Sequence, residues 1–316
     1  MTKLIVIVGI TGNQGGSVAG TFLNDPSWRV RGLTRDTQSS ASLALSAQGV
    51  QMVQADLHDP SSLTDVFRGA NLVFSVTDFW KPYFDPVNRV CAAAQGKSIG
   101  RYAYELEFEQ GKNIADAVAR ELDGLDDVGL IANVFPTYLK ENYPGLAKKT
   151  SYLHTGYFFT SWQILPGRWF AKLPDGSVQM QFPTSPNMLI PHLDPRKDTG
   201  PWARALLRLP PNSTVLAASE WMTWPQWIKT WGDVTGAKTS YKQTTIEDLD
   251  EHIPGGAGKE IGEMFQLSSE FAYNAHQANT LKTWDLEKLG LSVPTTSLRD
   301  YIESEDWVAA RILPGA

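Results

Sequence analysis

An apolar strand followed at once by a glycine-rich turn is the feature that most constrains the fold of this chain. Residues Leu4 to Val8 are continuously apolar, and residues Gly16 to Leu23 are small or apolar at helical spacing. Glycines between a strand and a helix allow a tight turn and let the backbone approach a pyrophosphate at the helix N-terminus. The turn, which has the spacing Gly-x-x-Gly-x-x-Gly, therefore predicts a dinucleotide site made by Gly9, Ile10, Thr11, Gly12, Asn13, Gln14 and Gly15.

The first half of the chain alternates between strand and helix patterns. Strands are predicted at 29–34, 50–54 and 70–76, and helices at 41–48 and from Pro60, with Asp59 as N-cap. This order requires right-handed crossovers, so the fold class is α/β, a doubly wound parallel-sheet Rossmann domain with helices on both faces. The pattern continues with a helix at 112–122 and strands at 128–132 and 152–159.

The second half of the chain is less regular and is rich in Pro, Gly and Trp. It predicts a smaller α+β substrate lobe at the carboxyl side of the sheet. We assign residues 1–160 to the dinucleotide-binding domain and 161–316 mainly to the substrate lobe, with later segments returning to the first domain. One face of a helix is predicted to carry four tryptophans, which either anchor the helix in the lobe or line an aromatic substrate, at Trp221, Trp224, Trp227 and Trp231.

Composition excludes several classes of protein. With 28 basic and 34 acidic residues the net charge is −6, which disfavours direct binding to nucleic acid. The single cysteine, Cys91, cannot form an intramolecular disulfide, and no run approaches the roughly 20 apolar residues of a membrane span. We therefore expect a cytoplasmic protein without membrane contact. The five histidines lack the spacing of a metal site, so no metal is expected.

The end of the second predicted strand addresses the choice of cofactor. A site for NAD usually carries a carboxylate there for the ribose 2′-hydroxyl, whereas this chain has Arg35, which can pair with a 2′-phosphate. NADP(H) is therefore the predicted cofactor. Two alternatives stay open: Arg35 is a solvated surface residue, or a small register shift places Asp36 at the ribose.

Two further strand ends complete the predicted cofactor site. Asp56 and Leu57 follow the third strand, where the acid contacts adenine or simply caps a helix. Thr77, Asp78 and Phe79 follow the fourth strand and should lie along the ribose and nicotinamide, because ligands bind outside the carboxyl ends of parallel strands. Phe79 can equally be a core aromatic residue.

Five blocks of sequence in the same order resemble the NmrA-like branch of atypical short-chain dehydrogenases. They are IVGITGNQGGSVA, LTRD, VQADLHDPSSL, SVTDFW and EQGKNIADA, and the resemblance extends less densely to residues 297–302. It implies an NADP(H)-preferring Rossmann domain with the contacts predicted above. It further implies a segment that closes over the nicotinamide, formed by Tyr157, Phe158, Phe159 and Thr160.

The chain departs from the family between residues 123 and 138. Relatives carry a strand, a serine-containing loop and a helix with a Tyr-x-x-x-Lys or His-x-x-x-Lys pair in this region, and sixteen residues are too few for all three. No tyrosine or histidine of this chain is followed by lysine four positions later, so the catalytic residues are unknown. Either a stretch has been lost through an error of gene prediction or cloning, or the protein works without it.

Two functions fit these observations. The first is an NADP(H)-dependent oxidoreductase that reduces a small carbonyl or enoyl metabolite, with Tyr157, Lys140 or water delivering the proton. The resemblance implies a metabolite reductase of a kind often found in secondary metabolism. The second is a non-catalytic NADP(H) sensor that acts on a regulatory protein partner. The aromatic residues of the second half favour the enzyme, and the shortened region favours the sensor.

Overall fold

The computed structural model describes residues 2–122, 129–132, 136–164, 166–251, 256–271, 273 and 279–313. Contacts divide the chain into two compact units. The first contains residues 1–154 and 199–215, and the second contains 155–198 and 216–316. This division puts residues 157–160 in the second unit, whereas the sequence assigned them to the dinucleotide-binding domain.

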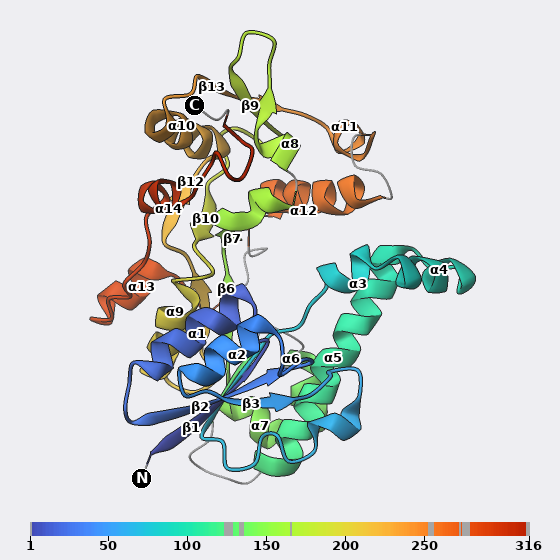
Figure 1. Ribbon diagram of the computed structural model, residues 1–316, viewed down its shortest axis with the longest axis vertical. Helices are drawn as coiled ribbons and strands as arrows, with labels where there is room; N and C mark the ends of the chain where they lie inside the picture. The colour runs from blue at the N-terminus through green and yellow to red at the C-terminus, as the bar shows by residue number, and fades with distance from the viewer. Residues whose placement is uncertain are drawn as a thin grey trace. The chain divides into compact units, whose positions relative to one another are not determined.

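A large twisted sheet carries the first unit (Figure 1). The part of the sheet that lies in this unit has, among the described residues, the strand order β11-β6-β5-β4-β1-β2-β3, and the strands from β3 to β6 pair in parallel. The chain order reverses between β1 and β4, which is where doubly wound sheets bind their ligands. The strand bounds are β1 Lys3–Val8, β2 Trp28–Thr34, β3 Gln51–Gln54, β4 Leu72–Ser75, β5 Gly129–Ala132, β6 Thr150–Thr155, β11 Thr214–Ala217 and β14 Thr280–Leu281.

Helices connect these strands, as the sequence predicts. Helix α1 packs on α9, and α5 packs on the short 3-10 helix η1. Figure 1 shows α3 and α4 against the N-terminal half of α5, beyond the edge of the sheet. The bounds are α1 Asn13–Leu23, α2 Ser40–Ala47, η1 Pro60–Leu63, α3 Trp80–Phe84, α4 Pro86–Ala94, α5 Ile99–Leu122, α6 Pro136–Asn142, α7 Pro144–Lys149 and α9 Thr199–Leu206.

Helix α5 closes the main core of this unit. Ile114 and Val118 on its C-terminal half pack with Val6, Val73 and Leu130 of three neighbouring strands. The sequence predicts this half, at 112–122, but the helix is 24 residues long and begins at Ile99. Its first half was missed because aromatic or apolar residues alternate with glutamates over 104–109 and most of these turns are part-exposed, so they lack the apolar face on which the prediction depended.

The second unit contains two small sheets, of order β12-β10-β7 and β13-β9-β8, and several short helices. Its strands are β7 Tyr157–Phe158, β8 Ala171–Lys172, β9 Val178–Phe182, β10 Ile190–Leu193, β12 Glu220–Met222 and β13 Thr239–Gln243. Its helices are η2 Phe159–Gln163, α8 Pro166–Trp169, α10 Trp224–Thr235, α11 Ile246–Glu251, α12 Ala257–Phe271, α13 Thr283–Lys288 and α14 Leu298–Ser304.

Aromatic side chains fill the core of the second unit. Trp224, Trp227 and Trp231 line one face of α10 and are fully buried, with Trp169 edge-on to the first two at centroid distances of 5.0 and 4.9 Å. The tryptophan cluster therefore anchors the helix. Trp221 departs from the predicted helical face, because it lies in strand β12 and packs on Trp284 instead.

Residues 152–159 do not form the single strand that the sequence predicts. The strand is interrupted at Gly156. Tyr152 therefore belongs to β6, and Tyr157 belongs to β7 in a different sheet. A Cβ atom at Gly156 would lie 2.6 Å from the backbone oxygen of Pro191, so only glycine lets the two segments pass this closely. Gly156 interrupts the apolar pattern of this stretch, and an isolated glycine in a strand pattern was the available signal of the break.

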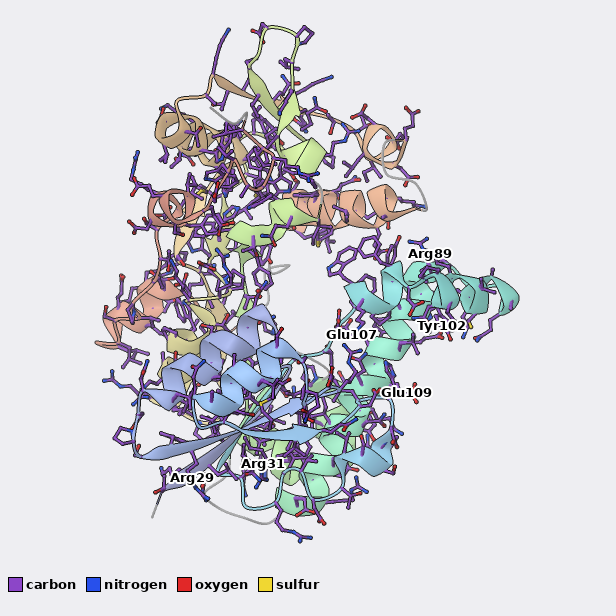
Figure 2. All side chains as sticks on the ribbon, in the orientation of Figure 1. Arg29, Arg31, Arg89, Tyr102, Glu107 and Glu109 are labelled. Atoms are coloured by element: carbon purple, nitrogen blue, oxygen red, sulfur yellow. The ribbon has the colours of Figure 1, made fainter. Side chains whose placement is uncertain are left out.

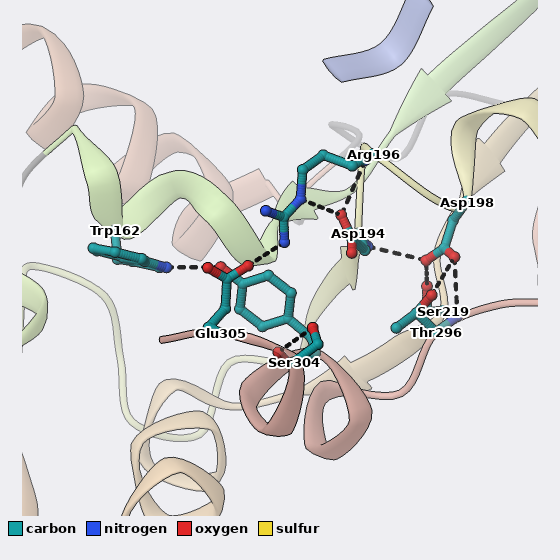
Figure 3. A network of polar contacts seen from close by, with 9 residues as sticks. Trp162, Asp194, Arg196, Asp198, Ser219, Thr296, Ser304 and Glu305 are labelled. Atoms are coloured by element: carbon teal, nitrogen blue, oxygen red, sulfur yellow. Dashed lines mark hydrogen bonds and ion pairs between the residues drawn. The ribbon is translucent and has the colours of Figure 1, made fainter. Parts of the chain in front are cut away.

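A polar network ties three segments of the second unit together (Figure 3). The buried carboxylate of Asp198 accepts hydrogen bonds from Ser219 Oγ at 2.5 Å and from the backbone and side chain of Thr296 at 2.9 and 2.8 Å. Asp194 beside it binds Arg196, which also pairs with Glu305. The network fixes the turn after β10 to the segment that leads into α14.

The buried His192 makes this unit sensitive to acid. Its side chain is 0% exposed, and burial lowers its pKa to about 3. In the unfolded chain this histidine is protonated near pH 6.5. The folded state is therefore not penalised by His192 above that pH, and it loses stability relative to the unfolded chain as the pH falls from 6.5 toward 3. We expect the free energy of unfolding in urea, followed by tryptophan fluorescence, to fall by about 2 kcal/mol from this residue between pH 7 and 5.

The variant His192→Gln should lose that part of the pH dependence. His154, whose pKa burial also lowers, acts in the same direction and stays in both proteins, so the comparison isolates His192. An equal fall in stability in the two proteins would contradict the assignment.

Candidate functional site

The glycine turn after β1 is held by contacts that leave no room for side chains. Gly9 has a φ of +72°, and a Cβ there would lie 2.6 Å from Val76 Cγ2 at the end of β4. A Cβ at Gly15 would lie 2.2 Å from the Gly9 backbone oxygen, and the amide of Gly12 donates to that same oxygen at 2.9 Å. The turn is thus folded tightly onto the point where the strand order reverses.

The N-terminus of α1 opens from this turn without a capping side chain. Gly12 is the N-cap residue, no side chain caps the helix, and its first turn has no acidic residue. Thr11, Gly12 and Asn13 are exposed. A helix end of this kind favours a phosphate through its amides and its dipole. The residues present therefore fit the pyrophosphate of a dinucleotide, as the sequence predicts.

Arg35 and Asp36 follow β2 and differ in how they are held. The Asp36 carboxylate accepts the Gln38 amide at 2.8 Å, and its backbone oxygen accepts the hydroxyl groups of Ser39 and Ser42. Asp36 is thus part of the turn that leads into α2. Arg35 is exposed, and within the described part of the chain no hydrogen bond or ion pair holds its guanidinium. Of the two residues, Arg35 has the side chain that is available to an anion.

The loop after β3 is ordered by its own side chains. The Asp56 carboxylate accepts the His58 amide at 2.9 Å, and its backbone amide donates to Ser62 Oγ at 2.9 Å. Asp56 therefore stabilises a local turn, which is close to the capping role that the sequence left open. The Leu57 carbonyl accepts the Asn113 side-chain amide at 2.9 Å, which fastens this loop to α5.

The tip of β4 is fastened to the same helix. Thr77 Oγ1 donates to Glu107 Oε1 at 2.7 Å, and the Asp78 amide donates to Gln110 Oε1 at 3.1 Å. Gln110 Nε2 also lies 3.0 Å from His58 Nε2. Burial raises the pKa of Glu107, and the nearby charge of Asp78 raises it further, while the bond from Thr77 lowers it.

Sequence reasoning missed the role of this polar row on α5. Glu107, Gln110 and Asn113 recur every third residue, so they lie along one side of the helix. Gln110 and Asn113 are buried, at 5% and 7% exposure. Two polar residues at helical spacing beside the apolar face were the available signal, and they fall inside the segment EQGKNIADA that was noticed only as a family block.

Phe79 begins an aromatic cluster rather than joining the main core. Its ring lies edge-on to Trp80 at a centroid distance of 5.1 Å, and Trp80 stacks on Phe84 at 5.7 Å. Phe79 and Trp80 are half-buried, and Phe84 is exposed. The cluster extends from the tip of β4 along α3.

The four predicted residues of the second unit form part of its aromatic core. Tyr157, Phe159 and Thr160 are buried, and Phe158 is half-buried. Tyr157 stacks on Phe265 at a centroid distance of 5.3 Å. Burial raises the pKa of the Tyr157 phenol well above its ordinary value.

Two tyrosines of the shortened region share one carboxylate. Tyr138 and Tyr143 donate to Asp116 Oδ1 at 2.6 and 2.9 Å, and burial together with this carboxylate raises the pKa of both phenols. Of the region that departs from the family, 129–132 forms β5 and 136–138 begins α6. Residues 123–128 and 133–135 lie outside the described residues.

Across the residues that the structure describes, no group of three or more His, Cys, Asp or Glu side chains is arranged to hold a metal ion, and no helix is both long and apolar enough to cross a membrane.

The model of the NmrA-like family matches residues 1–122 and 144–302. The chain belongs to the NmrA-like family. The unmatched stretch, 123–143, includes the whole region, 123–138, in which the sequence departs from the family pattern.

Curated relatives in this family are named as oxidoreductases. The NmrA-like family domain-containing oxidoreductase ptmS of Penicillium ochrochloron is 28% identical over 332 aligned positions, which cover 96% of this chain and 93% of the relative. That alignment is longer than this chain, so the relative carries residues that this chain lacks. The oxidoreductase lnbB of Aspergillus flavus is 29% identical over 80% of both chains.

Solved structures confirm the fold. NmrA, a negative transcriptional regulator, superposes with a TM-score of 0.69 at 18% identity over 96% of this chain and 95% of its own. The NADPH-dependent quinone oxidoreductase QOR2 of Escherichia coli, solved with NADPH, has a TM-score of 0.63 at 17% identity over 95% and 98%. NmrA has also been solved with NADP and with NAD.

Two glycines of α1 provide a direct test of the close packing at the turn. Gly15→Ala forces a Cβ against the Gly9 backbone and should destabilise the protein by about 1–3 kcal/mol. Gly20→Ala, on the same helix, meets nothing within 4 Å and should stabilise it by up to about 1 kcal/mol. Thermal unfolding should therefore move in opposite directions in the two variants. Equal shifts would show that the turn is not tight.

Proposed function

We propose that this protein is an NADP(H)-dependent oxidoreductase that reduces a small carbonyl or enoyl metabolite. The observation that carries the proposal is the glycine turn, which packs against the end of β4 where the strand order reverses and opens onto the uncapped N-terminus of α1. Membership of a family whose curated relatives are named as oxidoreductases supports the redox chemistry.

In this proposal each strand end has a role in binding. The turn from Gly9 to Gly15 and the N-terminus of α1 hold the pyrophosphate, while Asp56 and Leu57 lie at the adenine. Thr77, Asp78 and Phe79 lie along the ribose and nicotinamide. The bound cofactor supplies the hydride, and the protein orients it and keeps a proton available.

Arg35 selects NADP(H) over NAD(H) in this scheme. It is exposed and free of protein partners among the described residues, while the neighbouring Asp36 carboxylate is used in its own turn. A guanidinium binds a 2′-phosphate through charge-assisted hydrogen bonds, whereas a carboxylate would repel it.

A second candidate function is a sensor that binds the dinucleotide and acts on a protein partner. The missing Tyr-x-x-x-Lys pair favours it, because a sensor needs no proton donor. A sensor should consume no NADPH with any carbonyl compound, and its partner affinity should depend on the redox state of the dinucleotide.

Removing the Arg35 side chain tests the choice of cofactor. Arg35→Ala should weaken NADPH binding by about 10- to 100-fold, since hydrogen bonds to charged groups contribute about 1.5–3 kcal/mol. Binding of NADH should be unchanged. Calorimetric titration with NADPH, NADP⁺, NADH and NAD⁺ measures both effects.

Arg29→Ala is the matched control, because Arg29 lies exposed near the opposite end of β2 (Figure 2). It should leave all four affinities unchanged. Equal losses in the two arginine variants would point to a general effect of charge. Failure of the wild-type protein to bind any of the four dinucleotides would refute both candidate functions.

A further inference from the structure

Glu107 occupies a special place among the carboxyl groups of the first unit. Its side chain lies at the tip of β4, where it accepts the Thr77 hydroxyl at 2.7 Å. Val76, which precedes Thr77 in the chain, packs against Gly9 of the glycine turn. Glu107 is therefore joined to the point where the strand order reverses through one hydrogen bond and one packing contact.

The surroundings of Glu107 favour its protonated form. No ion pair reaches this carboxyl among the residues that the structure describes, and it is partly buried. The charged or titratable groups around it are Asp78 at the tip of β4 and His58 in the loop after β3, which reaches the same row through Gln110. Burial and the Asp78 charge raise the Glu107 pKa, so part of the protein population keeps this proton at higher pH than an ordinary carboxyl does.

The other candidates for proton donation are committed elsewhere or poorly suited. Tyr138 and Tyr143 donate hydrogen bonds from their phenol hydroxyls to Asp116, and their pKa values are raised, which makes them weaker acids. The pKa of the buried Tyr157 phenol is raised further. Lys140 is exposed on α6. Glu107 alone in this group combines a raised carboxyl pKa with a place at a strand tip of the proposed site.

We propose that the Glu107 carboxyl supplies the proton that accompanies hydride transfer in this protein. The inference rests on the proposed NADP(H) function. Reduction of a carbonyl breaks its π bond: the carbon accepts the hydride from NADPH, and the oxygen accepts the Glu107 proton. The products are an alcohol, NADP⁺ and the Glu107 carboxylate, which takes its next proton from water. A general acid of this kind accelerates proton transfer by about 10²–10⁴-fold.

This role couples the ionisation of Glu107 to the redox state of the dinucleotide. The oxidised nicotinamide ring is cationic and favours a carboxylate beside it, whereas the reduced ring is neutral. NADP⁺ should therefore expel the Glu107 proton on binding, and NADPH should not. The ratio of NADP⁺ to NADPH affinity should rise with pH, by at most about tenfold per pH unit, until Glu107 is ionised in the free protein.

Calorimetry can count that proton without any substrate. Each dinucleotide is titrated between pH 5.5 and 8 into the wild-type protein, Glu107→Gln and Glu109→Gln, in two buffers with different ionisation enthalpies. Glu109 is the matched control because it lies on the same helix, exposed and on another side (Figure 2). The 2′-phosphate titrates in this range too, but it is common to both dinucleotides and is present with every variant.

In the wild-type protein and Glu109→Gln, we expect NADP⁺ to release up to one more proton than NADPH at the acid end of the range. In Glu107→Gln this difference should vanish, and the affinity ratio should no longer depend on pH. The glutamine still accepts the Thr77 hydroxyl, so the fold should be kept, and thermal unfolding checks it. Thr77→Val removes a bond that lowers the Glu107 pKa, so it should move the transition to higher pH.

A proton difference that persists in Glu107→Gln would overturn the proposal and leave the cofactor assignment intact. The absence of dinucleotide binding in the wild-type protein would instead refute the proposed function and this inference with it. Oxidation of NADPH by 9,10-phenanthrenequinone supplies a further readout, in which Glu107→Gln should lower kcat by about 10²–10⁴-fold with little change in KM. Unchanged kcat in that variant would also overturn the role, and without quinone turnover the proton count decides alone.

Discussion

The rest of the first unit depends on the contact between the glycine turn and the end of β4. Gly9 can approach Val76 only because it has no Cβ atom and adopts a positive φ. Gly15 can pack against the Gly9 carbonyl only because it also has no Cβ atom. A third glycine in β2, Gly32, makes room for the side chain of Ile10. These contacts set the direction in which α1 leaves the sheet, and with it the place to which its amides point.

Helix α5 links that site to the hydrophobic core. Its C-terminal half is packed by Ile114 and Val118 into the largest apolar cluster of the unit, which fixes its rotation and height above the sheet. The same helix carries Glu107, Gln110 and Asn113. Their side-chain hydrogen bonds hold the loops after β3 and β4 in place relative to the helix. The polar row is therefore placed by core packing, so a change in the core beneath it is expected to alter the site without touching it.

The sequence predicts the parallel sheet and the glycine turn because both have strong local signals. A continuous apolar strand, a glycine triplet and a helix with small residues leave few other folds for residues 4–23. The strand position of Trp221 was not predictable, because it depends on which segment packs opposite and does not change the local pattern. The same holds for Glu107: its distinction from Glu109 is the neighbour that the helix brings it to, and helical spacing alone names no neighbour.

The two sides of the proposed site differ in how much of the family pattern they keep. On the β5 side, residues 123–143 are not matched by the family model, and Tyr138 and Tyr143 are hydrogen-bonded to Asp116. The β4 side keeps every block of the resemblance, and its polar residues form one connected set from His58 to Thr77. A loss confined to β5 removes a proton donor but leaves the binding surface for a dinucleotide intact. Under the proposed function the proton therefore comes from the β4 side or from water, and the ionisation of Glu107 on α5 distinguishes those two sources.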